Sequence, residues 1–171
     1  MTKIIAPAKL TLSLVITGVR SDGFHLIEAE MVSLNIADIL DITDADTTTV
    51  TMSGPYAVGV PTDESNLVSR ALVLAGRTAQ VHIEKHIPHG GGLGGGSTDA
   101  AAVLKWAQWS DVPETARLGA DIPFCLVGGR AFVTGIGEIV TPLPHEDKKV
   151  TLFLPPMSVS TPAVYREWDA M

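Results

Sequence analysis

Residues 88–99 read PHGGGLGGGSTD, and six of the seven positions from 90 to 96 are glycine. The residues before this run, from Gln80 to Ile87, alternate between apolar and polar and predict a β-strand. The residues after it, from Ser97 to Trp109, include three consecutive alanines and predict an α-helix. Glycines let a loop approach a ligand closely, and the helix directs free N–H groups and its positive dipole end toward that loop. The arrangement predicts a binding site for phosphate groups.

Three other interpretations of the glycine run fit less well. A Walker A loop has a lysine before its Ser or Thr, and here Gly96 precedes Ser97. A dinucleotide-binding fingerprint lies in a parallel βαβ unit with an acidic residue about 20 positions on, and a proline-broken segment separates the run from Asp121. A flexible linker has polar, Ser-rich flanks rather than an alternating strand and an Ala-rich helix. Phosphate binding is therefore the preferred interpretation. A branched side chain at Gly95 is expected to obstruct the passing phosphate oxygens.

Outward from the loop, strands and helices mix without regular βαβ spacing. Residues 10–17 alternate, with four apolar side chains on one face, and predict a half-buried strand. Further strands are expected through residues 31–35 and 40–52, with a turn at 44–46. A helix is expected from Asn66 to Leu74 with Ser65 or Asn66 as its cap. The order of elements predicts an α+β fold rather than a doubly wound sheet.

Near the end of the chain, Leu152, Leu154 and Val159 suggest another strand region, which Pro155 and Pro156 interrupt. No linker between domains stands out from the composition of the chain.

The composition is that of a globular, acidic chain: 171 residues, 46% hydrophobic, 18% charged, with a formal net charge of −7. The lack of any Lys or Arg cluster argues against binding of nucleic acid or of an anionic membrane surface. No run reaches the roughly 20 apolar residues of a membrane span, and Met1 to Lys9 does not resemble a signal peptide. The single cysteine, Cys125, is expected to be buried and inert and fits a reducing compartment. A cytoplasmic location is expected.

The run from residue 88 to 102 resembles the ATP loop of the GHMP kinases, in the triple-glycine form typical of the diphosphocytidyl-methylerythritol kinase subfamily. Five other segments match that subfamily in the expected order: residues 6–10 (APAKL), 20–25 (RSDGFH), 118–124 (LGADIPF), 135–138 (GIGE) and 160–165 (STPAVY). The resemblance implies an α+β fold of the GHMP kinase N-terminal type, similar to domain 2 of ribosomal protein S5. It implies an ATP-binding domain over residues 1–150 and, over 151–171, the start of a C-terminal α/β domain that is mostly absent.

The resemblance also implies where ATP and Mg²⁺ bind. Asn66 and Lys85 are expected near the adenosine, and the hydroxyl of Ser97 or Thr98 could help to place Mg²⁺. His82, His86, His89 and His145 lack the spacing of metal ligands. The expected ATP-binding residues are Asn66, Lys85, Pro88, His89, Gly90, Gly91, Gly92, Leu93, Gly94, Gly95, Gly96, Ser97 and Thr98.

By the same resemblance, Asp121 accepts the proton of the acceptor hydroxyl and Lys9 steadies the charge that develops. From the sequence alone, the preferred interpretations are a helix cap for Asp121 and a charge at a strand edge for Lys9. The acceptor's cytosine would stack between Phe24 and Tyr165, with His25 at its edge. Thr11, where the subfamily usually has Asn, and Thr161 complete the expected substrate contacts.

Three functions remain open at this point. The first is ATP-dependent phosphorylation of a cytidine diphosphate alcohol in the non-mevalonate isoprenoid pathway. The second is another GHMP small-molecule kinase, of the homoserine or mevalonate type. The third is a truncated ATP-binding module without catalytic activity. The oligomeric state, monomer or homodimer, stays open.

Overall fold

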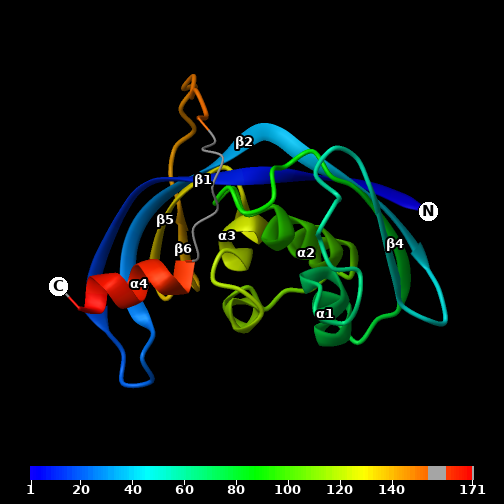
Figure 1. Cartoon of the computed structure of the whole chain (residues 1–171), viewed down its shortest axis with the longest axis horizontal. Coiled ribbons are helices and arrows are strands. Elements are labelled where there is room, and N and C mark those ends of the chain that lie inside the picture. Colours follow the sequence, from blue (N-terminus) through cyan, green and yellow to red (C-terminus); the bar gives the residue numbers. More distant parts are fainter. Residues whose placement is uncertain (154–160, 171) are drawn as a thin grey trace.

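The computed structural model describes residues 1–153 and 161–170, shown in Figure 1. In the C-terminal helix it describes the backbone throughout but the side chains only at residue 164 and at residues 166–169. The last predicted strand region falls mainly on residues 154–160, which lie outside the described residues. Leu152 is described and is not part of a strand.

Six strands form one mixed sheet in which β2 is central. β2 pairs with β1 along one edge, and with β5 and then β4 along the other. Only the β3–β4 pair is parallel among the described strands, which confirms the α+β prediction and excludes a doubly wound sheet. The strands are β1 (Thr2–Val19), β2 (His25–Asp44), β3 (Thr49–Ser53), β4 (Ala79–Glu84), β5 (Arg130–Gly135) and β6 (Ile139–Pro142).

Helices α1, α2 and α3 lie together under the arch of β1 and β2, as Figure 1 shows. α2 runs through the middle of this layer, and its residues 98–104 are all buried. Its run of alanines lets α2 pack closely, and leucine, isoleucine, valine and phenylalanine side chains fill the remaining space. The helices are α1 (Leu67–Leu74), α2 (Gly95–Trp106), the 3₁₀ helix η1 (Pro113–Arg117), α3 (Ile122–Val127) and α4 (Thr161–Asp169).

The expected burial of residues 10–17 is wrong, although they do form a strand. Leu12 is 40% exposed and Leu14 is 45% exposed. The pairing with β2 shifts register between Thr11 and Ser13 and again between Ile16 and Gly18, and each shift breaks the two-residue alternation. Leu14 lines a pocket instead of the core, so this half of β1 contributes to a cavity wall.

Helix α1 begins at Leu67, and the predicted cap is Asn66 rather than Ser65. The Asn66 side-chain oxygen accepts a hydrogen bond from the Val68 amide at 2.8 Å. Its side-chain nitrogen donates to the Pro61 carbonyl at 2.6 Å. The cap therefore fixes both the helix and the loop that precedes it.

Replacing Asn66 by alanine should lower the free energy of unfolding by about 1–2 kcal/mol, because the first turn of α1 loses its side-chain acceptor. Denaturant unfolding of the chain without ligand measures this loss. Asn35 is exposed on β2, and Asn35→Ala should change the stability by no more than about 0.5 kcal/mol. Equal losses in the two variants would show that the cap does not stabilise the helix.

Candidate active site

The glycine-rich loop connects the end of β4 to the start of α2, as the alternation and the alanines predicted. Its one large apolar side chain, Leu93, is 3% exposed and packs in a small cluster with Ala8 and Ile87. The Leu93 carbonyl accepts a hydrogen bond from the Lys9 amide at 2.9 Å. The middle of the loop is therefore pinned to β1, while the glycines before it remain at the surface.

Gly94 ends the loop and caps α2 with a left-handed backbone, at φ 69°. No side chain caps this helix, and its first hydrogen bond along the backbone runs from the Thr98 amide to the Gly94 carbonyl. The amides of residues 95–97 consequently have no acceptor within the helix. They supply donors and a positive field at the loop.

These features surround a pocket of about 300 Å³. Its lining contains all of the expected ATP-binding residues except Thr98: Asn66, Lys85, Pro88, His89, Gly90, Gly91, Gly92, Leu93, Gly94, Gly95, Gly96 and Ser97. Thr98 is buried instead, and its hydroxyl donates to the Pro7 carbonyl at 2.7 Å. A glycine-lined wall next to free helix amides fits a chain of phosphates, since both features favour close approach of an anion.

A second pocket, of about 490 Å³, lies on the other side of the loop. Its wall contains the expected acceptor residues whose side chains the structure describes: Lys9, Thr11, Phe24, His25 and Asp121. Gly92, Gly94 and Ser97 line both pockets. The two sites therefore meet at the end of the loop and the first turn of α2.

Lys9 and Asp121 face each other in the second pocket, with Lys9 Nζ 3.0 Å from Asp121 Oδ2. Asp121 occupies the N-cap position of α3, but its side chain caps no helix amide. Lys9 is 8% exposed, and its ammonium also donates to the Thr11 hydroxyl at 3.3 Å. The helix-cap and strand-edge interpretations therefore do not describe the contacts of these side chains, which pair within a cavity.

Behind this pair, Cys125 is 7% exposed, as the sequence predicted. Burial, aided by the nearby carboxylate of Asp121, raises the pKa of the Cys125 thiol to about 12. The thiol therefore stays protonated and unreactive at neutral pH.

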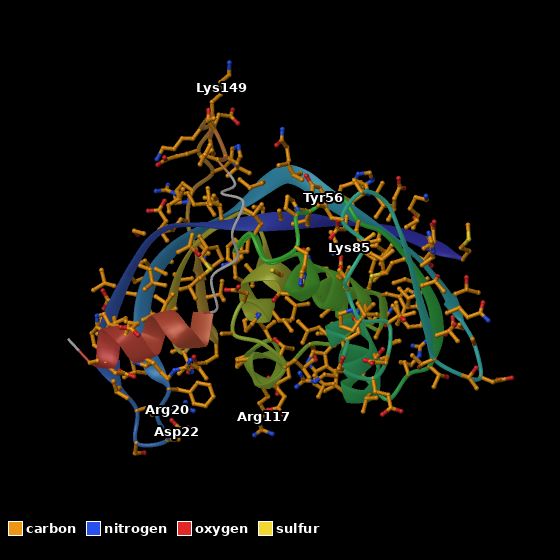
Figure 2. All side chains as sticks on the ribbon, in the orientation of Figure 1. Arg20, Asp22, Tyr56, Lys85, Arg117 and Lys149 are labelled. Atoms are coloured by element: carbon orange, nitrogen blue, oxygen red, sulfur yellow. The ribbon has the colours of Figure 1, made fainter. Side chains whose placement is uncertain are left out.

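The hairpin between β1 and β2 presents Phe24 to the second pocket, with its ring 55% exposed. The Arg20 guanidinium lies 5.4 Å from the centre of this ring and is itself held by Asp22 at 2.6 Å. Figure 2 labels Arg20 and Asp22 on this hairpin. Phe24 is the one of these three residues that lines the pocket, and an exposed aromatic ring there suits stacking of another aromatic ring.

Helix α4 approaches the same pocket through His25. The His25 Nε2 atom lies 2.7 Å from Asp169 Oδ1, and the Trp168 ring meets the imidazole edge to face at 5.5 Å. Thr161 and Tyr165 lie on the backbone of α4, and their side chains lie outside the described residues. The proposed aromatic partner of Phe24 is therefore not placed.

The structure also reveals two functional candidates that sequence reasoning missed, Asp38 and Asp99. Lys85, expected beside adenosine, is buried with its ammonium held between these two carboxylates. Figure 2 shows Lys85 beneath the arch of the sheet. A charged residue within the apolar stretch of β2 was the available signal for Asp38, and Asp99 closes the motif that residues 88–99 form.

Among the residues that the structure describes, no three His, Cys, Asp or Glu side chains are grouped to hold a metal ion. In the described part of the chain, no helix has the length and apolar character needed to cross a membrane.

Comparison with known proteins agrees with this geometry. Residues 66–129 match the family described as "GHMP kinases N terminal domain". The chain is 43% identical over 162 residues to the 4-diphosphocytidyl-2-C-methyl-D-erythritol kinase of Paracoccus denitrificans (strain Pd 1222), covering 94% of this chain and 59% of that protein. It is 40% identical over 181 residues to the Clostridium botulinum (strain Eklund 17B / Type B) protein of the same name, covering 96% and 64%.

Solved structures of kinases have a similar fold. A crystal structure of 4-(cytidine 5'-diphospho)-2C-methyl-D-erythritol kinase superposes with a TM-score of 0.71 at 36% identity, covering 96% of this chain and 63% of that one. A putative homoserine kinase from Listeria monocytogenes superposes with a TM-score of 0.56 at 18% identity, covering 96% and 64%, which shows a shared fold. The chain thus spans about three fifths of the length of these proteins.

Proposed function

We propose, for a chain that belongs to the GHMP kinases, that the whole protein transfers the γ-phosphate of ATP to the 2-hydroxyl of 4-diphosphocytidyl-2-C-methyl-D-erythritol. This reaction belongs to the non-mevalonate route to isoprenoid precursors. One observation carries the proposal: the Lys9–Asp121 pair lies in a pocket that shares a wall with the glycine-lined pocket. A phosphate donor on one side of that wall and an alcohol on the other would meet beside this pair.

In this mechanism the glycine loop and the free amides of α2 bind the phosphates of ATP. When bound, ATP supplies the phosphoryl group that is transferred. Asp121 Oδ2 accepts the proton of the acceptor hydroxyl, and the Lys9 ammonium offsets the negative charge that gathers on the reacting oxygens. The walls of the two pockets hold the reacting groups in line, which is the main catalytic contribution available for phosphoryl transfer.

Mg²⁺ is part of the proposal as the partner of ATP. Ser97 is the protein residue we assign to it, because its hydroxyl-bearing side chain borders both pockets. Mg²⁺ commonly takes one or two protein oxygens and completes its shell with phosphate oxygens and water. The Thr98 hydroxyl is less suited, since the Pro7 carbonyl already accepts its hydrogen.

We propose that cytosine stacks on Phe24 with Tyr165 opposite and that His25 reads the base edge, with Thr11 and Thr161 as further contacts. The exposed ring of Phe24 and the position of His25 in the same pocket support this. We also propose residues 1–150 as the ATP-binding domain and 151–171 as the start of a C-terminal domain. The single cysteine supports a reducing, cytoplasmic location.

ADP release by the whole protein tests the function. ADP should form only when the cytidine diphosphate alcohol is present, and neither homoserine nor mevalonate should replace it. Phe24→Ala should raise the KM for this acceptor by about fivefold while the KM for ATP stays unchanged, because stacking contributes about 1 kcal/mol.

Phe153, which is 87% exposed and borders neither pocket, provides the matched control as Phe153→Ala. ADP release with homoserine but not with the cytidine compound would support the second function instead. Tight ATP binding without any transfer would support a non-catalytic module.

A further inference from the structure

A buried cluster of three charged side chains lies next to the ATP pocket. Asp38, Lys85 and Asp99, which we call the charge clamp, have side chains that are 0%, 4% and 3% exposed. Lys85 Nζ donates to Asp38 Oδ2 and, at 2.5 Å, to Asp99 Oδ2. Burial of charged groups is costly unless they are paired, so a cluster of this kind calls for an explanation.

The charge clamp joins the two ends of the glycine loop. At the first end, Asp38 Oδ1 accepts hydrogen bonds from the amides of His86 and Ile87, at 2.5 and 2.8 Å. At the second end, Asp99 lies in the first half of α2, just after the free amides. Lys85 links the two carboxylates and so ties the strand that enters the loop to the helix that leaves it.

The same ammonium also lies close to the loop backbone itself. A Cβ atom added at Gly95 would lie 3.4 Å from Lys85 Nζ and 3.2 Å from Ile87 Cγ2. The clamp therefore determines how closely the start of α2 approaches the end of β4. Between these ends, residues 89–92 are exposed, and their position depends on the spacing of the two ends.

Asp99 is not needed to balance the charge of Lys85. Asp38 alone would form a neutral pair with Lys85, and the second carboxylate gives the cluster a net negative charge whenever it is ionised. Asp99 Oδ1 is buried and has no hydrogen-bond partner among the described residues. Burial raises the pKa of Asp99 to about 7, although the attraction of Lys85 opposes the shift.

The pKa of Lys85 is also raised, which favours its charged form. Burial lowers the pKa of its ammonium, but the attraction of Asp99 and the hydrogen bond that Lys85 donates to Asp38 outweigh burial and raise it. Lys85 stays charged at neutral pH, with its charge directed at the two carboxylates. A buried carboxylate that costs stability and has an unpaired oxygen points to a role in function.

We propose that Asp38, Lys85 and Asp99 are positioning residues that hold the two ends of the glycine loop at the spacing required to bind the triphosphate of ATP. Lys85 acts through Asp38 and Asp99. The inference rests on the proposed function, because it names how the ATP pocket of that function is kept in shape.

The variant Asp99→Asn distinguishes a role in positioning the loop from a contribution to folding stability alone. The variant keeps the shape of the side chain and leaves Asp38 and Lys85 as a neutral pair, so the unfolding midpoint should stay the same or rise. The Kd for Mg-ATP should rise by about tenfold or more, while kcat of the whole protein at saturating ATP changes less than about twofold. Amide exchange at residues 90–98 without nucleotide should become faster.

Asp44→Asn is the matched control. It breaks an exposed ion pair with Arg77 at the C-terminal end of β2, away from the loop, and should change none of these quantities. An Asp99→Asn variant with unchanged Kd and unchanged loop exchange would overturn the proposal. A drop in the unfolding midpoint with unchanged Kd would also overturn it, because Asp99 would then be structural only.

A second variant, Lys85→Met, removes the cation of the charge clamp. It leaves two buried carboxylates without their cation, so the unfolding midpoint should fall strongly. Adding Asp99→Asn to Lys85→Met should restore part of the midpoint but not the affinity for ATP, because both links across the loop are then lost. Full recovery of affinity in the double variant would contradict the proposal.

Different results would contradict the proposed function and the role of the charge clamp. A wild-type protein that does not bind Mg-ATP would remove the proposed function. The exchange rates of residues 90–98 in the ligand-free variants would still show whether the charge clamp holds the loop.

Discussion

Replacing Asp121 by asparagine should lower kcat of the whole protein by about a thousandfold, within the range that a positioned general base contributes. The amide keeps the size of the carboxylate but cannot accept the proton of the acceptor hydroxyl. The Kd for ATP should change by less than about twofold, because Asp121 lies in the pocket proposed for the acceptor and outside the lining of the glycine-lined pocket proposed for ATP. Steady-state kinetics and calorimetry measure the two quantities separately.

Asp46 is exposed in the turn after β2 and provides the control as Asp46→Asn, which should leave both quantities unchanged. An Asp121→Asn protein that keeps more than about a tenth of its turnover would remove this carboxylate from the mechanism. A loss of ATP affinity as large as the loss of kcat would point to collapse of the pocket instead.

Replacing Gly94 by valine should weaken ATP binding by more than about a hundredfold and make turnover undetectable. Two physical effects combine at this position. Its φ of 69° lies in the left-handed region, where a β-branched residue is strained. A Cβ at Gly94 would also lie 2.7 Å from Lys9 Cγ, so the loop or the lysine has to move.

Gly76→Val is the control that distinguishes the effect of backbone strain from a steric effect on the pocket. Gly76 has a φ of 61° and no atom within 4 Å of an added Cβ, so its valine variant carries the backbone strain alone. Both variants should lose stability in denaturant unfolding, and only Gly94→Val should lose ATP binding in calorimetry. Normal ATP binding by Gly94→Val would mean that the loop does not hold the phosphates.

The structure adds a second reason to the one first given for Gly95. A side chain there is expected to block the phosphates directly. The nearest atoms to an added Cβ belong to Ile87 and Lys85, inside the protein, so a substitution at Gly95 would disturb the charge clamp. Both glycines matter, for different reasons, and only the packing distinguishes them.

Local sequence patterns predicted the elements that depend on local contacts. The cap at Asn66 and the alternation of Val81 and Ile83 in β4 were confirmed because capping and pleating act within a few residues. The alternation at residues 10–17 predicted a buried face that does not form. The register shifts against β2 break the alternation, and they are set by the partner strand and not by β1.

The site depended on long-range contacts that no local pattern describes. Lys9 and Asp121 meet across most of the chain, and the sequence alone favoured a helix cap for Asp121 and a strand-edge charge for Lys9. The resemblance to the GHMP kinases brought them together as a pair. Asp38 was missed because its partners, Lys85 and the two amides beside it, lie just after β4, much later in the chain.

The wall shared by the two pockets bears on whether both substrates bind before the phosphoryl group is transferred. Gly92, Gly94 and Ser97 border both cavities. Under the proposed function, the phosphoryl group would therefore pass directly from donor to acceptor, and we expect both substrates to be on the protein together. Initial-rate plots against one substrate at several levels of the other should intersect rather than run parallel, as they would for a ping-pong route through a phosphorylated enzyme.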